Sequence, residues 1–175
     1  MIAATLNISR KGLGIAGVAK RLRQISGYAA KVGVLQSTNK RSSNHPGSEG
    51  LGNADIGLEN EFGSGPQGIP ERSFLRMPLQ DHMQDAVQSV GPSIEGVLTA
   101  GAAPSLPAVA LGEAGVLVVN QAFASDGFGD WPANARLTEE LKGFNDPLTE
   151  TGQLQRAITS KVVTVKSSVP APADT

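Results

Sequence analysis

Apolar and polar side chains alternate in three stretches of the chain, which is the pattern of a half-buried strand. The first stretch is residues 1–10 and the second is residues 28–35. The third, residues 158–169, is rich in valine and threonine and alternates at Val163 and Val165; both residue types favour strands. The pattern therefore predicts three short strands, one of them close to each end of the chain.

A period of three to four residues predicts helices between these strands. Residues 11–26 form an amphipathic helix with a basic outer face, and Gly27 is placed to end it. A second, shorter helix is predicted over residues 55–62, with Asp55 as its N-cap. The side chains of this helix that are available for burial are Ile56, Leu58 and Phe62.

A longer helix is predicted to start near Pro78, a residue well suited to a first helical turn. Apolar side chains at helical spacing continue as far as Val90, so the helix should have three turns or more. Gly91 and Pro92 then break the pattern, before a further short apolar segment.

The most apolar segment, residues 108–123, allows two interpretations. Its spacing fits one helical stripe, whereas Val116 to Val119 alone fit a buried strand; we favour the helix. After it, Thr149 can cap a short helix that ends near Ile158.

The remaining segments are rich in glycine, proline and polar residues. Residues 36–54 offer little to bury and are predicted to be a flexible loop that is ordered by a partner. Residues 125–147 form another loop region, and residues 170–175 a disordered tail. The fold class expected is α+β, a small mixed or antiparallel sheet packed by a few helices with long loops, in one domain over residues 1–169.

Composition narrows the class of protein. The chain has 175 residues, enough for one domain with a core, and its lack of cysteine excludes disulfides, thiolate metal sites and a cysteine nucleophile. No uninterrupted apolar run reaches the ~18 residues typical of a membrane span. We therefore expect a protein made in the cytoplasm that does not enter a membrane.

The net charge of −1 conceals an asymmetry, because Glu49 is the first acidic residue and all earlier charges are positive. Such a dipolar chain suits head-to-tail association, or a basic surface that faces nucleic acid. A solvated helix face is the alternative. The candidate basic residues for contact with DNA, or for lining a lumen, are Lys20, Arg21, Arg23, Lys40 and Arg41.

Two blocks of sequence resemble the neck and tail-completion proteins of tailed bacteriophages, including minor tail proteins of the HK97 and lambda types and Mu-like virion morphogenesis proteins. The first block is Glu61-Phe62-Gly63, a glycine-rich loop and Ile69-Pro70-Glu71-Arg72-Ser73-Phe74-Leu75-Arg76. The second comprises Asp130-Trp131-Pro132, Leu137-Thr138 and Pro147-Leu148-Thr149-Glu150-Thr151-Gly152-Gln153-Leu154. The chain departs from the family pattern at Ser73, where proline is frequent.

The resemblance implies a structural virion protein that joins head and tail at the neck and catalyses no reaction. It implies a ring, of six subunits, between tail tube and head connector, with DNA passing through its lumen without specific binding. Its partners would be the tail tube, the tail terminator and the head-connector or stopper proteins. A tail terminator is an alternative within the same group.

Candidate contact residues between subunits follow from the first block. Arg72 and Arg76 flank an apolar pair, an arrangement suited to an interface, although pairing with Glu71 and Asp81 on an ordinary surface is the alternative. Trp131 fits an interface anchor or a packing plug in the core. The full candidate set is Phe62, Ile69, Arg72, Phe74, Leu75, Arg76 and Trp131.

Enzymatic chemistry has little support in the sequence. His45 and His82 have no metal-binding spacing, and Glu59 and Glu61 do not share a helix face. The glycine-rich loop, residues 63–68, lacks the lysine of a phosphate-binding loop. We expect no enzyme, no metal and no cofactor. A hydrolase acting on cell walls is the weakest alternative, and a DNA-binding protein that uses the basic helix is the stronger one.

Overall fold

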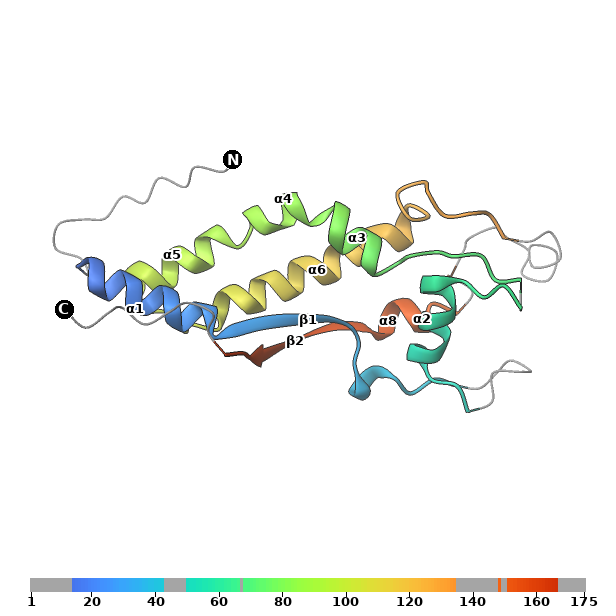
Figure 1. Cartoon of the computed structure of the whole chain (residues 1–175), viewed down its shortest axis with the longest axis horizontal. Coiled ribbons are helices and arrows are strands. Elements are labelled where there is room, and N and C mark those ends of the chain that lie inside the picture. The colour runs from blue at the N-terminus through green and yellow to red at the C-terminus, as the bar shows by residue number, and fades with distance from the viewer. Residues whose placement is uncertain (1–13, 43–49, 67, 135–147, 149–150, 167–175) are drawn as a thin grey trace.

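A two-stranded antiparallel sheet runs beside a long helix in the computed structural model of the chain (Figure 1), which describes residues 14–42, 50–66, 68–134, 148 and 151–166. The strands are β1 (Tyr28–Val34) and β2 (Ile158–Thr164), and the helix is α6 (Leu106–Ala124). Tyr28 pairs with Thr164 and Val34 with Ile158. The predicted α+β class is confirmed, and the described sheet is antiparallel.

Alternation along the strands gives the sheet two different faces. Ala30 and Val32 of β1 lie against α6, where two glycines allow a close approach. A Cβ atom added at Gly112 would lie 2.9 Å from the Ser160 Cβ, and one added at Gly115 would lie 3.0 Å from the Val32 Cγ2. The glycines of α6 therefore determine how closely this helix packs on the sheet.

Replacing Gly112 by alanine is expected to lower the free energy of unfolding by about 1 kcal/mol. Alanine gains about 1 kcal/mol in helix propensity, but overpacking a tight contact costs roughly 1–3 kcal/mol, and we expect the overpacking to outweigh the gain. Gly96→Ala in α5 (Gly91–Ala100) is the matched control, because the nearest atom to its added Cβ is 3.7 Å away. Denaturant titration should show that Gly112→Ala lowers the free energy of unfolding and that Gly96→Ala raises it. A stabilised Gly112→Ala variant would refute the close approach of α6 to the sheet.

The basic N-terminal helix is confirmed as α1 (Ile15–Ser26), which packs against α5. Arg21 donates hydrogen bonds to the carbonyl oxygens of Val97 and Leu98 in α5, at 2.7 and 2.8 Å. The apolar stripe of α1 is not buried as its pattern predicts, because Ile15 is 91% and Leu22 45% exposed. The side of α1 that carries Arg21, next to that stripe, is the one held to α5.

The single helix predicted after Pro78 is two short ones, α3 (Arg76–Asp81) and α4 (Met83–Gln88). Pro78 does lie in the first turn of α3, but the chain leaves helical geometry at His82, with φ −117° and ψ 6°. The His82 ring there stacks on Phe128, with 3.7 Å between ring centroids. Gly91 and Pro92, predicted to interrupt, instead begin α5.

The apolar segment is helix α6, as favoured, and its strand alternative is wrong. Within the described residues, α6 is the one helix long and apolar enough to cross a bilayer, with a mean hydropathy of 1.4. Half of that segment is buried against the rest of the fold. Contact with the rest of the fold therefore buries half of this apolar segment.

The far end of the molecule holds α2 (Asn53–Phe62), α8 (Gln153–Ala157) and a 3-10 turn (Gln36–Thr38), as Figure 1 shows. Asp55 is not the N-cap of α2; Gly52 is, and its N–H donates to the Asp55 carboxylate at 2.7 Å. Leu58 and Phe62, predicted to be available for burial, are 62% and 58% exposed. Gly57 faces inward, since the ring of Phe74 packs directly on it.

Part of the predicted 36–54 loop is held in place. The buried side chain of Asn53 donates to the carbonyl oxygens of Thr38 and Lys40, at 3.0 and 3.2 Å, and Arg41 donates back to it at 3.2 Å. Asn53 is therefore an exception to the expectation that this segment offers little to bury. Residues 43–49 lie outside the described part of the chain.

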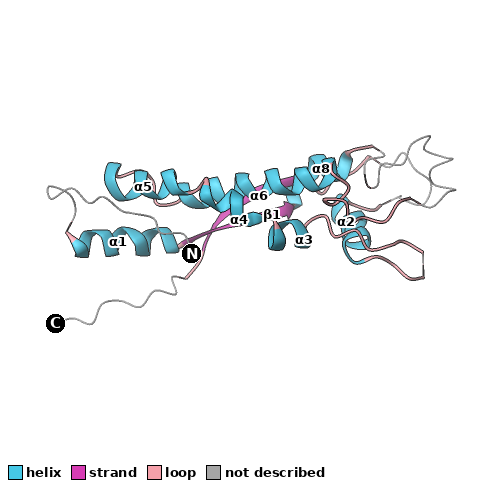
Figure 2. Cartoon of the chain, turned by 90° about the horizontal axis from the view of Figure 1, so that it is seen from above, coloured by secondary structure: helices cyan, strands magenta, loops and turns pink. Residues whose placement is uncertain are grey.

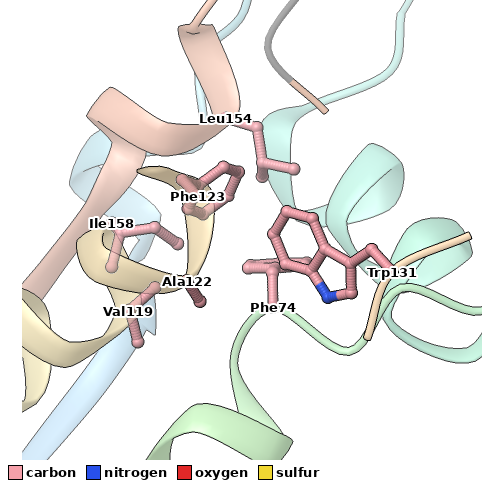
Figure 3. Close-up of a cluster of buried hydrophobic side chains, with 7 residues drawn as sticks. All are labelled: Phe74, Val119, Ala122, Phe123, Trp131, Leu154 and Ile158. Atoms are coloured by element: carbon pink, nitrogen blue, oxygen red, sulfur yellow. The ribbon is translucent and has the colours of Figure 1, made fainter. Parts of the chain in front are cut away.

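The main core lies where α6, α8, β2 and the segment before α3 meet. Figure 2 shows α1 and α5 at the opposite end of the molecule from α2 and α8. The core residues, drawn in Figure 3, are Phe74, Val119, Ala122, Phe123, Trp131, Leu154 and Ile158. The predicted strand over residues 1–10, the Thr149 cap and the tail over residues 170–175 lie outside the described residues.

Candidate functional site

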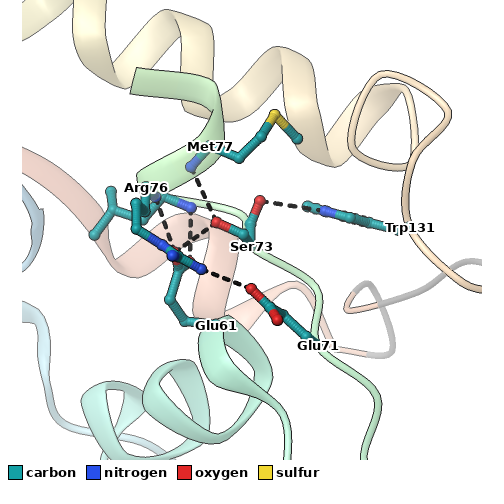
Figure 4. Close-up of polar contacts among 7 residues, drawn as sticks. Glu61, Glu71, Ser73, Arg76, Met77 and Trp131 are labelled. Atoms are coloured by element: carbon teal, nitrogen blue, oxygen red, sulfur yellow. Dashed lines mark hydrogen bonds and ion pairs between the residues drawn. The ribbon is translucent and has the colours of Figure 1, made fainter. Parts of the chain in front are cut away.

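The carboxylate of Glu61 accepts three hydrogen bonds in a buried position at the start of α3 (Figure 4). The donors are the Ser73 hydroxyl at 2.7 Å and the backbone N–H groups of Leu75 and Arg76 at 2.9 and 3.0 Å. These two N–H groups stand at the N-cap and first position of α3. Glu61 therefore caps α3 from another helix, with its charge at the favourable end of the helix dipole.

Ser73 extends this arrangement in two directions. Its hydroxyl oxygen accepts a hydrogen bond from the Met77 N–H at 3.0 Å, which satisfies another donor of the first turn. Its carbonyl oxygen accepts from the Trp131 indole at 3.3 Å (Figure 4). The start of α3 is thus tied to α2 on one side and to the segment after α6 on the other.

Arg72 is 6% exposed, and its side chain is hydrogen-bonded to backbone carbonyl groups in the segment after α6. Its Nε and Nη2 donate to the carbonyl oxygens of Pro132 and Ala133, each at 2.9 Å, and burial lowers the pKa of its guanidinium. Its backbone N–H donates to the Asn60 carbonyl at 2.7 Å. Together, Glu61, Arg72, Ser73 and Trp131 form a buried polar unit, which we call the Glu61 cluster.

The surface beside this cluster carries three side chains in contact. The Arg76 guanidinium lies 5.2 Å from the centroid of the Phe62 ring and pairs with the Glu71 carboxylate at 2.6 Å. All three side chains are more than half exposed. We call Phe62, Glu71 and Arg76 the outer patch.

The described residues 63–66 and 68–70 lie between α2 and α3; we call this segment the arm. Ser64 and Ile69 exchange two backbone hydrogen bonds, at 2.8 and 2.9 Å, so the arm has a fixed base. Gly63 has φ 69°, and an added Cβ would lie 2.8 Å from the Glu71 nitrogen, so this position requires glycine.

The predicted contact residues divide into two groups. Phe74 and Trp131 are 3% and 8% exposed and belong to the core, and Arg72 belongs to the Glu61 cluster. Their burial inside the subunit leaves little of these three side chains to meet a neighbour. Leu75 and Ile69 are half-buried, while Phe62 and Arg76 remain exposed.

The predicted basic residues do not gather in one place. Lys20, Arg21 and Arg23 lie on α1, and the guanidinium of Arg21 is hydrogen-bonded to α5. Lys40 and Arg41 lie beside α2, at the opposite end of the molecule (Figure 1). The candidate residues for contact with DNA, or for lining a lumen, therefore form two separate groups.

The carboxylate of the Glu61 cluster is committed to hydrogen bonds within the fold. Both oxygens of Glu61 are engaged with donors, and in the described part of the chain no group of three or more histidine, aspartate or glutamate side chains can hold a metal ion. His82 is stacked on Phe128, and His45 lies outside the described residues. What the arrangement does is fix the arm and the outer patch to the core.

Sequence reasoning missed Glu61 as the cap of α3, because twelve positions separate it from Ser73 and no local motif links them. It also missed Lys31 and Lys161, which are direct cross-strand partners on the face of the sheet away from α6. Strand alternation places both lysines on that face once the register is known. The pairing register of β1 and β2, which brings Lys31 opposite Lys161, could not be read from the sequence.

Comparison with family models, with curated proteins and with solved structures gave no match for this chain.

Proposed function

We propose that this chain is a structural virion protein of a tailed bacteriophage, which completes the tail or joins head and tail at the neck. It forms a homo-oligomeric ring, of six subunits, between the tail tube and the head connector. A tail terminator at the same junction is the nearest variant of this proposal. No reaction is catalysed, and DNA passes through the ring.

The observation that carries the proposal is where the two resembling blocks meet. Arg72 and Ser73 belong to the first block, and Trp131 and Pro132 to the second. Hydrogen bonds from Arg72 to Pro132 and from Trp131 to Ser73 join the blocks in the Glu61 cluster. The family resemblance thus rests on residues that act together, and they hold the arm and the outer patch at the surface.

A cryo-EM reconstruction of the intact particle tests this proposal. Density for the chain in a ring between connector and tail tube, with the arm at a boundary between subunits or rings, would support it. Absence from the mature particle would overturn it. A companion genetic test replaces Phe62 and Arg76 by alanine, which should leave the protein folded but reduce the yield of joined particles.

A second candidate function, non-specific binding of duplex DNA, is favoured by Lys31 and Lys161. Both are exposed, they are direct cross-strand partners, and neither has an ion pair with another described residue. Like charges placed directly opposite each other destabilise a sheet. A phosphate backbone along this face would relieve that repulsion.

Replacing Lys31 and Lys161 together by alanine is expected to raise the free energy of unfolding by about 0.5 kcal/mol, because the like-charge pair is removed. If the face binds DNA, the same change should weaken binding and reduce the log-log salt slope by about one unit per lysine. Lys40→Ala, at the other end of the molecule, is the control. Equal DNA affinity in all three proteins would exclude this face as a DNA surface.

A further inference from the structure

A groove between α4 and α6 carries uncompensated negative charge over an apolar floor. It encloses about 710 Å³, and its lining includes Ala86, Ala110 and Leu117. Leu117 is 59% exposed although it lies in the middle of the most apolar helix. The floor of the groove therefore leaves apolar surface in water that one more element would cover.

The charges of the groove are Asp85 on α4 and Glu113 on α6. Neither carboxylate has an ion pair with another described residue. An apolar floor between two free carboxylates suits an amphipathic helix that has a cation beside its apolar stripe.

Helix α1 has that character. Ile15, Ala19 and Leu22 follow the i, i+4, i+7 spacing of one stripe, and Ile15 and Leu22 are the exposed side chains described above. Arg23 lies beside the stripe, and its Nε is buried without a hydrogen-bond partner. Arg23 has no ion pair with another described residue. Lys20 is exposed on the other side of the same helix, away from the stripe.

We propose that α1 of one copy of this chain docks in the α4–α6 groove of the next copy. Leu22 and Ile15 would cover the floor around Leu117, with Arg23 beside them facing the carboxylates of Asp85 and Glu113. The two surfaces differ, so the contact is head-to-tail, and repetition of it closes a ring or extends a filament. This inference rests on the proposed ring and names the surfaces that build it.

Cysteine cross-linking of the full chain tests the contact, because the natural sequence contains no cysteine. A Leu22→Cys variant mixed with a Leu117→Cys variant should give a disulfide-linked dimer under mild oxidation. Neither variant alone should form it efficiently, since each carries its thiol on only one of the two surfaces. Leu22→Cys mixed with Leu58→Cys is the matched control, because Leu58 is 62% exposed on α2, away from the groove.

Charge reversal supplies a second readout. Asp85→Lys with Glu113→Lys should lower the cross-linking yield at least tenfold, and Arg23→Glu on the other partner should restore part of it. Lys20→Glu, on the other side of α1, is the control and should restore less. Equal yields in the control pair, or no cross-link at the highest attainable concentration, would overturn this contact. A ring seen at the neck together with that result would leave the proposed function intact and assign its interface elsewhere.

Discussion

Replacing Phe74 by alanine is expected to lower the free energy of unfolding by about 4 kcal/mol. The side chain is 3% exposed, lies 5.4 Å from the Phe123 ring centroid and fills the space over Gly57. Truncation removes apolar surface from the core and leaves a cavity between α2 and α6, which the surrounding helices can only partly close. Urea titration followed by circular dichroism measures the change.

Phe62→Ala is the matched control for this prediction. It removes the same atoms from a side chain that is 58% exposed, so the loss should be below about 1 kcal/mol, mostly from its contact with Arg76. Similar losses for both variants would mean that Phe74 is not a core residue. The contrast also matters for assembly, because a defect in Phe74→Ala particles would report unfolding, whereas one in Phe62→Ala particles would report a lost contact.

Glu61→Ala should destabilise the fold by about 3 kcal/mol, the second largest effect expected. The change leaves the Leu75 and Arg76 N–H groups and the Ser73 hydroxyl without the acceptor that now satisfies them. Unsatisfied buried donors and the loss of a charge at a helix N-terminus both contribute. Thermal and urea unfolding give the magnitude, and hydrogen exchange at the Leu75 and Arg76 amides should accelerate.

Two further variants make the Glu61 result specific. Glu61→Gln keeps one acceptor oxygen and should lose about half as much stability as Glu61→Ala. Glu59→Ala lies on the same helix, has no hydrogen bond or ion pair with another described residue, and should change stability by less than about 0.5 kcal/mol. If Glu61→Ala were as mild as Glu59→Ala, the capping role would be refuted.

The elements that sequence predicts well here are those whose pattern and packing agree. Residues 28–34 alternate because one side of β1 meets α6, and half of the apolar segment over residues 106–124 is buried against the sheet and the other helices. The break at His82 could not be predicted in the same way. It coincides with the stacking of the His82 ring on Phe128, a contact between residues forty-six positions apart in sequence.

The candidate site also combines features that the sequence predicts with features that it does not. Hydrophobicity marks Phe74, Trp131 and Phe62 equally as residues to bury, but does not say whether the burial is inside one subunit or between two. The structure buries the first two in the core and leaves Phe62 exposed. For Arg72 the sequence suggests an exposed residue, because it is an arginine in a turn-rich segment. The structure instead buries its side chain, which donates hydrogen bonds to carbonyl oxygens about sixty residues away.

The antiparallel pairing of β1 with β2 has a consequence for biosynthesis. Strand β1 leaves the ribosome long before β2 does, since Tyr28 pairs with Thr164. Closing so long a loop is entropically unfavourable and slow, so helices α3 to α6 should form first and present a partly uncovered α6 while translation continues. Nascent chains truncated before Ile158 should therefore remain susceptible to proteases, and resistance should emerge only when β2 has cleared the exit tunnel.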